Sequence, residues 1–343
     1  MDQAMSAIGM KNLSWPLVSV IVITKGRHEL AKAAVASILA GDYPAEKREV
    51  IVVEEADAPC PIGGEGVRYS AIPVRNLGFP FARNKGVSLA SADIIAFTDD
   101  DCLVERKWLK ELVWPLIESA DAMAVAGAVL VCGGGAIGEC ENILGFPGGG
   151  AKYLHQAQGK TIRMATFSTC NCAVRKRAIE SSGGFCEKLE NGGEDSFLSK
   201  TISEKGLIIY NPKACVYHKA RDSFAGVLRW FSRRGRASVE QARIANDKYA
   251  CIAPLVFNSV LLRFAVVAII CLLLKLALPQ AVMAFSALAL LYCASVLWRF
   301  RWARLYYSSI KTFILLPVVK VVMDVGTDLG VLKALIAPAA RRN

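Results

Sequence analysis

The hydrophobic positions divide the chain into two parts. Up to His218, short apolar runs rich in β-branched residues alternate with segments whose apolar residues recur at helical spacing, and from Phe224 onward long apolar runs dominate. Short apolar runs bounded by turn-forming residues predict buried strands, so the first part predicts an α/β fold with a mostly parallel sheet. The expected strands are 17–23, 48–54, 94–98, 122–131, 166–174, 207–210 and 215–218, and the expected helices are 29–39, 82–89, 106–119 and 196–205.

The first two strands and the helix between them predict a βαβ unit with a right-handed crossover. Thr24-Lys25-Gly26-Arg27 follows the first strand, and Glu54-Glu55-Ala56-Asp57 ends the second. Ligands of open α/β sheets bind beyond the carboxyl ends of the strands. We therefore expect Thr24 and these acids to lie along one rim of the sheet.

Three consecutive carboxylates, Asp99-Asp100-Asp101, end the strand at 94–98. Adjacent carboxylates repel one another unless a cation compensates them. Hard divalent ions such as Mg²⁺ prefer oxygen ligands and keep coordination positions for substrate phosphates. The run therefore predicts a metal site at the rim, and the alternative is a solvated acidic turn or helix cap.

Charged residues also stand at two predicted helix starts. Arg83 and Lys85 suit a diphosphate, which backbone N–H groups and the helix dipole also favour, although each could equally face solvent. Glu194 and Asp195 precede the helix at 196–205, where the dipole favours the ionised form. Helix capping alone would explain one acid at that place, not two.

The segment 132–150 is loaded with glycine, including Gly133-Gly134-Gly135 and Gly148-Gly149-Gly150. Glycine runs form regular elements only at an entropic cost. We expect a mobile loop beside the substrate, and a disordered surface segment is the alternative.

Several short features occur between Val18 and His218 in one order and spacing. They are the Val-Ile-Val-Ile-Thr strand, the strand 49–53 followed by acids, Asn76-x-Gly78, Ala82-Arg83-Asn84, Asp99-Asp100-Asp101, Gly183-Gly184-Phe185, Glu194-Asp195, and the Tyr-Asn-Pro-x-Ala-x-Val-Tyr-His segment that ends at His218. Together they resemble family 2 of the inverting, nucleotide-sugar-dependent glycosyltransferases, which have the GT-A fold.

The resemblance implies a donor site and a metal site. Thr24 and the acids Glu54 and Glu55 would contact the nucleotide base and ribose, with Arg83 near the base or the diphosphate. Asp99 and Asp101 would be the two acids of the family's DxD motif, one holding a divalent metal, Mg²⁺ or Mn²⁺, and the other the donor sugar or ribose. His218 is a candidate further metal ligand, and the alternative is a histidine hydrogen-bonded beneath the site.

The resemblance also implies a base. Asp195 would be the general base, and Glu194 would orient it or the acceptor. An acceptor hydroxyl needs a carboxylate to take its proton, and a diphosphate leaving group needs its charge neutralised, so one base and one metal suffice for a single displacement with inversion. Two acids flanking a glycosidic bond, as in a hydrolase, fit the clustered aspartates and Arg83 less well.

Two positions depart from the family pattern. Many members have Asp-Asp-Gly-Ser after the second strand, where this chain has Glu54-Glu55-Ala56-Asp57, so which acid contacts the base, and whether that base is uracil, stays open. Processive sugar synthases have Gln-x-x-Arg-Trp where this chain has Gly226 before Arg229-Trp230. The departure disfavours a processive polysaccharide synthase.

The second part of the chain predicts membrane association. Arg229, Arg233, Arg234 and Arg236 stand among tryptophan and phenylalanine within 224–247, which is typical of an interfacial helix. The apolar runs 253–278 and 281–298 are each long enough to cross a bilayer. Basic residues after the second run place that end, and with it the catalytic domain, in the cytoplasm.

A third apolar run, 312–337, contains Lys320, Asp324 and Asp328. If it spans, Arg341 and Arg342 fall outside against the charge rule, so spanning and re-entrant placements stay open. Asp324 and Asp328 share a helix face and are expected to pair between helices or between the subunits of a homo-oligomer.

Charge and cysteine content narrow the partners and the compartment. Of the net charge of +11, the segment 219–343 supplies 18 Lys and Arg against 5 Asp and Glu, which favours an anionic membrane surface over nucleic acid. The 11 cysteines are scattered and odd in number, as in a reducing compartment, and Cys170 and Cys172 lack the second pair of a zinc site. Residues 1–15 show no signal peptide.

These observations predict an integral membrane protein, in the plasma membrane if the source is prokaryotic. The expected divisions are a lead at 1–16, a GT-A domain at 17–222, a basic interfacial region at 223–250 and a membrane region at 251–343. The expected activity moves one sugar from a nucleotide-diphospho-sugar, UDP-sugar favoured, to a lipid or lipid-linked acceptor. Besides the processive synthase, the alternative is a non-catalytic membrane subunit that binds nucleotide.

Overall fold

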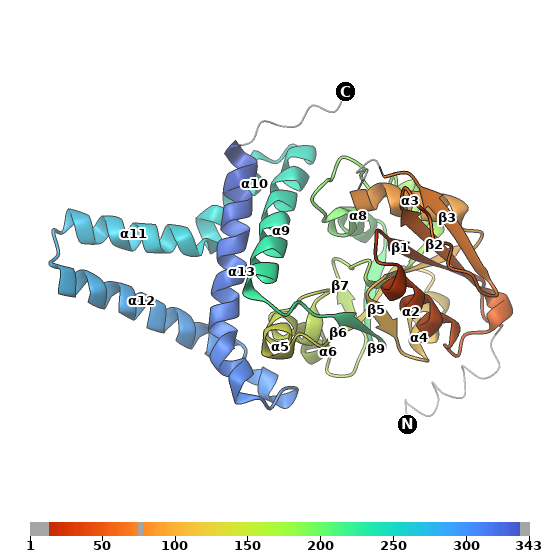
Figure 1. The fold of residues 1–343 in the computed structure, drawn as a ribbon, viewed down its shortest axis with the longest axis horizontal. Coiled ribbons are helices and arrows are strands. Elements are labelled where there is room, and N and C mark those ends of the chain that lie inside the picture. Colours follow the sequence, from red (N-terminus) through yellow and green to blue (C-terminus); the bar gives the residue numbers. More distant parts are fainter. Residues whose placement is uncertain (1–13, 75–77, 337–343) are drawn as a thin grey trace.

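A computed structural model describes residues 14–74 and 78–336. A sheet domain lies on one side of the molecule, and helices α9 to α13 lie on the other (Figure 1). The predicted features at Asn76 and Leu77, and most of the segment expected to lead into the fold, lie outside the described residues. The division into an α/β part and a helical part is as the hydrophobic pattern predicts.

Within the described residues, nine strands form one mixed sheet in the order β3-β2-β1-β4-β8-β6-β9-β5, with β7 paired to β9. β1, β2, β3 and β4 are parallel neighbours, whereas β8 runs antiparallel to β4 and β6. The strands are β1 Val18–Thr24, β2 Arg48–Glu55, β3 Val67–Ile72, β4 Ile94–Asp99, β5 Cys102–Val104, β6 Ala122–Cys132, β7 Ile162–Met164, β8 Asn171–Arg175 and β9 Leu207–Lys219.

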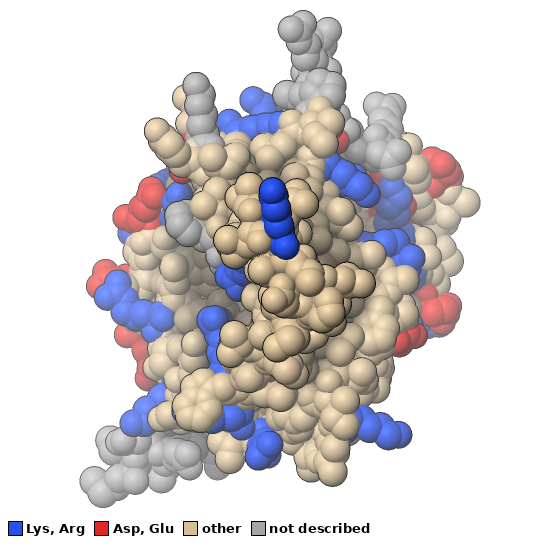
Figure 2. Space-filling view, turned by 90° about the vertical axis from the view of Figure 1, so that its left-hand side faces the viewer, with Lys and Arg blue, Asp and Glu red and all other residues tan. Residues whose placement is uncertain are grey.

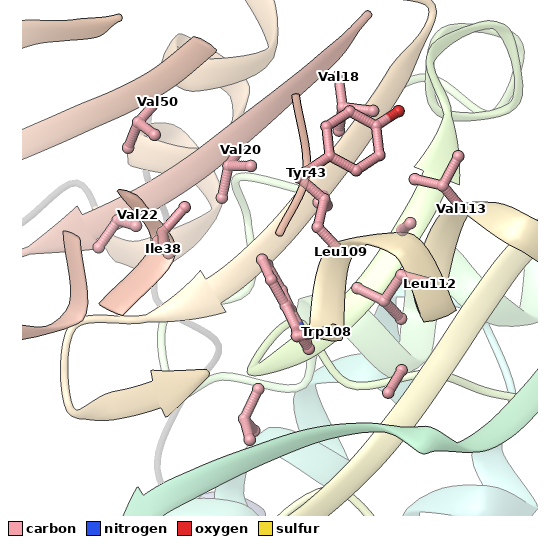
Figure 3. Packing of buried hydrophobic residues seen from close by; sticks show 14 of the residues in the cluster. Val18, Val20, Val22, Ile38, Tyr43, Val50, Trp108, Leu109, Leu112 and Val113 are labelled. Carbon is pink, nitrogen blue, oxygen red and sulfur yellow. The ribbon is translucent and has the colours of Figure 1, made fainter. Parts of the chain in front are cut away.

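Both faces of the central strands are buried, which explains their continuous apolar runs. Val18, Val20 and Val22 of β1 face one layer of helices, where they pack with Ile38 and Leu112 (Figure 3). The alternate residues of β1 pack against the opposite layer. The helices that cover the two faces are α2 His28–Leu39, α4 Trp108–Glu118, α3 Gly78–Leu89, α7 Lys176–Ser181 and α8 Glu194–Ser203.

The glycine-rich segment forms helices, so the expected loop is wrong. Helix α5 covers Gly135–Ile143 and α6 covers Gly150–Ala157. Gly134 and Gly149 precede them with φ of 73° and 92°. These left-handed positions let the chain turn into each helix, so the glycines allow helix starts rather than a lack of structure.

The last strand is also longer than expected. Two short strands were predicted at 207–210 and 215–218, but β9 is continuous and carries an irregularity opposite Gly127. Asn171 stabilises this irregularity because its side-chain amide donates to the carbonyl oxygens of Ala128 and Ala214, both at 2.8 Å. Strands β3, β5 and β7 were not predicted.

Helix α9, Phe224–Ile244, packs along α13, Ile310–Ile336, through glycines. A Cβ atom on Gly330 would overlap the carbonyl oxygen of Ser232, and one on Gly235 would overlap that of Thr327. The two backbones are therefore in direct contact, as in membrane helix pairs that meet through small residues. Any side chain at these positions would separate the helices.

The first apolar run is broken, so a single span over 253–278 is wrong. Helix α10, Lys248–Asn258, packs on α9 and α13, and α11, Val260–Leu273, projects from them. Ser259 has extended backbone between the two helices. The buried Asp328 of α13 accepts from the Ser259 hydroxyl at 2.8 Å and from the Leu261 N–H at 3.1 Å, which caps α11 at the break.

Helix α12, Leu278–Arg299, forms a hairpin with α11 that points away from the sheet domain (Figure 1). Among the described residues it is the one helix long and apolar enough to cross a membrane. Its most apolar stretch of 18 residues has a mean hydropathy of 2.0, and only 6% of that stretch is buried inside the molecule. Helix α13 instead lies across the base of the hairpin. Viewed from the hairpin end, basic side chains occur across the surface, whereas acidic ones lie toward its margins (Figure 2).

The glycine contact predicts a specific loss of stability. Gly330→Ala is expected to lower the free energy of unfolding by about 1–3 kcal/mol, because the added methyl group forces α9 and α13 apart. Thermal unfolding in detergent measures the change. Gly63→Ala is the control, since a Cβ atom there has no neighbour within 4 Å. Equal stability of Gly330→Ala and wild type would contradict the packing.

Candidate active site

A cleft of about 760 Å³ opens at the carboxyl ends of β1 and β4 and is closed on its far side by α9. Its lining comes from segments distant in sequence. The predicted site residues that line it are Thr24, Glu55, Arg83, Asp99, Asp101, Glu194, Asp195 and His218. The structure thus brings together all but one of them, and Glu54 is the exception.

Strand pairing brings a histidine to the aspartate run. Asp99 ends β4, and the chain turns at Asp100 and Asp101 into β5. Cys102 of β5 pairs with His218 of β9 in the antiparallel register. His218 therefore lies beside Asp101, with Nε2 3.3 Å from Asp101 Oδ1.

The hydrogen bonds of His218 suit a metal ion. Its Nδ1 lies 2.8 Å from the carbonyl oxygen of Lys219, which can only accept, so Nδ1 carries a proton. In the neutral ring Nε2 is then an acceptor and faces Asp101 Oδ1, a buried atom that receives no hydrogen bond from any described residue. Two facing acceptors can share a divalent ion, so these two residues fit a metal site.

Cys102 lies close to the same two residues. Its sulfur, a carboxylate oxygen of Asp101 and a ring nitrogen of His218 all lie within 4.8 Å of one another. Burial raises the pKa of the Cys102 thiol well above its ordinary value. The neutral thiol is a poor ligand for a hard divalent ion. Asp101 and His218 are therefore the better ligands.

Asp100 also lines the cleft, but other side chains bind its carboxylate. Its carboxylate accepts from the Thr24 hydroxyl at 2.7 Å and forms an ion pair with Arg27 at 2.5 Å. Burial raises the pKa of Asp100 to about 6, and Arg27 limits the rise. Arg27 also contacts Asp101 at 2.6 Å, so the β1–α2 turn supplies a cation to two of the three aspartates.

A buried ion pair joins α3 to the start of α8 across the cleft. Arg83 of α3 donates to Glu194 at the start of α8 and lies 3.4 Å from Asp99. Burial raises the pKa of Glu194, an effect that Arg83 opposes and Asp195 reinforces. The second carboxylate oxygen of Glu194 is buried and has no partner among the described residues. Arg83 therefore lies between Asp99 and Glu194, two acids that would otherwise repel each other.

Asp195 occupies the first turn of α8, which follows Gly193 in a left-handed conformation. One carboxylate oxygen accepts from the Ser196 N–H at 2.7 Å, and the other lies 3.4 Å from the Thr169 N–H. Backbone donors thus fix the orientation of the carboxylate. A carboxylate so placed can accept a proton from a group bound in the cleft.

The two acids that end β2 differ in position. Glu54 is buried away from the cleft, where it accepts from the Tyr69 hydroxyl and from the Cys60 N–H. Glu55 lines the cleft and pairs with Lys25 at 3.0 Å. Of the two, only Glu55 can contact a ligand there without rearrangement.

One side of the cleft is lined by arginines that the sequence did not predict to lie there. Arg221, Arg233 and Arg234 line the cleft together with Trp230, although the sequence assigned the arginines of α9 to the membrane interface. Arg221 pairs with the buried Glu141 of α5 at 2.8 Å and lies 4.1 Å from the Trp230 ring.

Residues 19–182 match the family model described as Glycosyl transferase family 2. A pre-mycofactocin glycosyltransferase of Mycobacterium tuberculosis is 25% identical over 216 residues, 61% of this chain and 45% of that protein. A glucosyl-dolichyl phosphate glucuronosyltransferase of Haloferax volcanii is 33% identical over 121 residues, 33% of this chain and 38% of that protein. The chain thus spans less than half the length of these two relatives.

A solved structure shares the fold over nearly the whole chain. The mannosyltransferase of Pyrobaculum calidifontis, in complex with GDP-Man and Mn²⁺, aligns with a TM-score of 0.61 at 18% identity, over 97% of this chain and 94% of that one. The alignment extends beyond the sheet domain into the helical part. Asp195 and His218 lie beyond the segment that the family model matches.

The Arg83–Glu194 pair predicts non-additive effects on stability. Arg83→Met is expected to lower the free energy of unfolding by about 3–5 kcal/mol, because Glu194 and Asp99 lose their counterion. Adding Glu194→Gln is expected to restore part of the loss. Chemical unfolding of both variants measures the coupling.

The exposed pair of Arg106 and Asp42 provides the control, since Arg106→Met is expected to change stability little. Additive losses in the double variant would contradict the coupling between Arg83 and Glu194.

Proposed function

We propose that this chain is a family 2 glycosyltransferase of the GT-A fold, and that it moves a single sugar with inversion from a nucleotide-diphospho-sugar to a membrane-associated acceptor. The observation that carries the proposal is the placement of Asp195 in the same cleft as Asp99, Asp101 and His218. A proton acceptor and a metal-binding pair facing one cavity are the groups that a single displacement needs.

In this proposal Asp195 takes the proton of the acceptor nucleophile as that atom attacks the anomeric carbon. The N–H groups of Ser196 and Thr169 fix the orientation of its carboxylate. Glu194, held by Arg83, is a positioning residue at the start of the same helix. The acceptor would lie beside α9, whose Trp230 lines the cleft.

Asp101 and His218 would hold the divalent metal, Mg²⁺ or Mn²⁺, with Asp99 toward the donor sugar or ribose. When bound, this ion would neutralise the charge that develops on the leaving diphosphate. Arg27 contacts Asp101 and is placed to act on the same diphosphate. The complex of the Pyrobaculum enzyme with GDP-Man and Mn²⁺ supports this donor class and metal.

The nucleotide would lie at the ends of β1 and β2. Glu55 is the better candidate for a contact to base or ribose, because Glu54 is occupied by Tyr69 and Cys60. Thr24 donates to Asp100 and would act by positioning that acid. A UDP-sugar remains our preferred donor.

The proposed setting is a membrane with the sheet domain in the cytoplasm. Residues 17–222 would form the catalytic domain, 223–250 the interfacial region and 251–343 the membrane region, in which the α11–α12 hairpin inserts and α13 lies along the surface. The glucosyl-dolichyl phosphate named in the Haloferax relative supports a lipid-linked acceptor. Asp324 bonds Tyr292 and Lys320, and Asp328 bonds Ser259, so both acids pair between or along helices within the chain.

Replacement of the proposed base tests the activity. Asp195→Asn is expected to bind nucleotide sugar in the presence of Mn²⁺ as wild type does, and to lose transfer by about 10²- to 10⁴-fold, because the amide cannot accept the proton. Calorimetry and transfer of labelled sugar to membrane extracts measure the two effects. Asp121→Asn, at an exposed turn, is the control. Undiminished transfer by Asp195→Asn would exclude Asp195 as the base.

Replacement of a proposed ligand tests the metal site. Asp101→Asn is expected to weaken Mn²⁺ binding by more than the roughly 10- to 100-fold that follows loss of a supporting group. Electron paramagnetic resonance of free Mn²⁺ measures this binding. Asp100→Asn is the matched control and is expected to have a smaller effect, because Asp100 bonds Thr24 and Arg27. The reverse order of the two variants would overturn the ligand assignment.

A further inference from the structure

A loop that lines the cleft leads into the helix that carries Asp195. Residues 190–193 belong to the cleft lining and are followed directly by α8. The carbonyl oxygen of Gly193 accepts from the Ser196 hydroxyl at 2.9 Å and from the Phe197 N–H at 3.0 Å. The first turn of α8 is therefore bonded to the loop, and the position of the loop determines where Asp195 lies.

Glu240 of α9 binds this loop. Its carboxylate accepts two hydrogen bonds from Asn191, one from the side-chain amide and one from the backbone N–H, which lies 3.2 Å from Oε2. Hydrogen bonds to an ionised acceptor are roughly twice as strong as those between neutral groups. One carboxylate thus holds both N–H donors of a residue that stands just before α8.

The backbone of the loop also contacts α9. Gly193 has a φ of 84°, and a Cβ atom there would lie 2.0 Å from the side-chain nitrogen of Gln241 and 3.7 Å from the Cβ atom of Ala237. Positions 237, 240 and 241 share one face of a helix, because they are three and four residues apart. This face of α9 therefore touches the loop directly.

The same segment of α9 is fixed to α13. Helix α9 lies between α13 and the sheet domain (Figure 1). Val239, next to Glu240, forms a buried cluster with Val331 and Ala334 of α13. Arg243, farther along α9, donates to the carbonyl oxygen of Ala334 at 2.7 Å. Glu240 is therefore held in place by the helical part of the molecule.

The sheet domain binds the loop at a different place. Asn84 of α3 donates to the carbonyl oxygen of Phe185 at 2.9 Å and to the Glu187 carboxylate at 2.7 Å. Both contacts precede the residues that line the cleft. The part of the loop nearest to α8 is instead bonded to α9 through Asn191.

From these contacts we infer that Glu240 is a positioning residue for sugar transfer, and that it acts by binding Asn191 and thereby setting the place of Asp195. The inference rests on the proposed function, in which Asp195 is the base. It extends that function to a residue outside the cleft lining. It also makes the helical part of the molecule responsible for the geometry of the base.

Removal of the carboxylate tests this role. Glu240→Ala is expected to lower kcat about 10- to 100-fold, because a small displacement of a reacting group has an effect of this size. Binding of nucleotide sugar with Mn²⁺ is expected to change less than about twofold, because the loop is not part of the proposed metal site. Glu204→Ala, an exposed acid at the other end of α8, is the matched control. Equal losses of kcat in the two variants would overturn the inference.

Combination with the substitution of the base separates positioning from general damage. In a chain that already carries Asp195→Asn, Glu240→Ala is expected to lower the residual transfer less than about twofold, because residues that act as a unit have non-additive effects. A further loss as large as the one in the wild-type background would overturn action through Asp195.

An exchange of partners provides a rescue. Asn191→Asp alone places two carboxylates against each other and is expected to lower kcat as Glu240→Ala does. Adding Glu240→Gln is expected to restore most of the loss, since the glutamine oxygen can accept from the backbone N–H while its amide donates to the new carboxylate. No gain of kcat in the double variant would overturn the role of the pair.

Hydrogen exchange tests the contact without any transfer. The amide of Asn191 is expected to exchange about tenfold faster or more in Glu240→Ala, because it loses its acceptor, and at the wild-type rate in Glu204→Ala. Unchanged exchange in Glu240→Ala would refute the contact and with it the inference. Faster exchange together with a wild type that transfers no sugar would refute the proposed function while the contact stands.

Discussion

Crowding of carboxylates at one edge of the sheet is the constraint on which this molecule depends. Parallel strands that end together bring the aspartate run beside the start of α8, where two more acids stand. Burial and mutual repulsion raise the pKa of Asp99 and Glu194, and Arg83 between them opposes both effects. Arg27 opposes the rise in the pKa of Asp100 and also forms an ion pair with Asp101. The edge is stable because each acid has a fixed counterion or backbone donors.

The central strands of the α/β part could be predicted because they are buried on both faces. Strands buried on both faces show uninterrupted apolar runs, and their ends locate the rim without knowledge of the strand order. The approach of His218 to Asp101, by contrast, depends on an antiparallel pairing between β5 and β9. That pairing joins segments more than a hundred residues apart, and β5 is only three residues long. The resemblance supplied His218, whereas the local pattern could not.

The failures share a physical cause, which is that tertiary contacts overrode local preference. Glycines at 133–135 and 148–150 serve as left-handed helix starts rather than as loop residues. The apolar run at 253–278 breaks at Ser259 because Asp328, distant in sequence, caps the new helix. The arginines of α9 were assigned by composition to a membrane surface. Their actual positions follow from the rotation of α9, which its contact with Gly330 determines.

Helix α9 belongs at once to the helical part of the molecule and to the wall of the cleft. The sequence boundary at residue 222 separates the sheet domain from everything that follows, yet the cleft includes Trp230, Arg233 and Arg234 from beyond that boundary. A fragment that ends at residue 222 would therefore retain the aspartates and Asp195, the proposed base, but lack one side of the cavity. An exchange of membrane modules between relatives would likewise exchange part of the active site, so anchoring and acceptor choice would be inherited as a single unit.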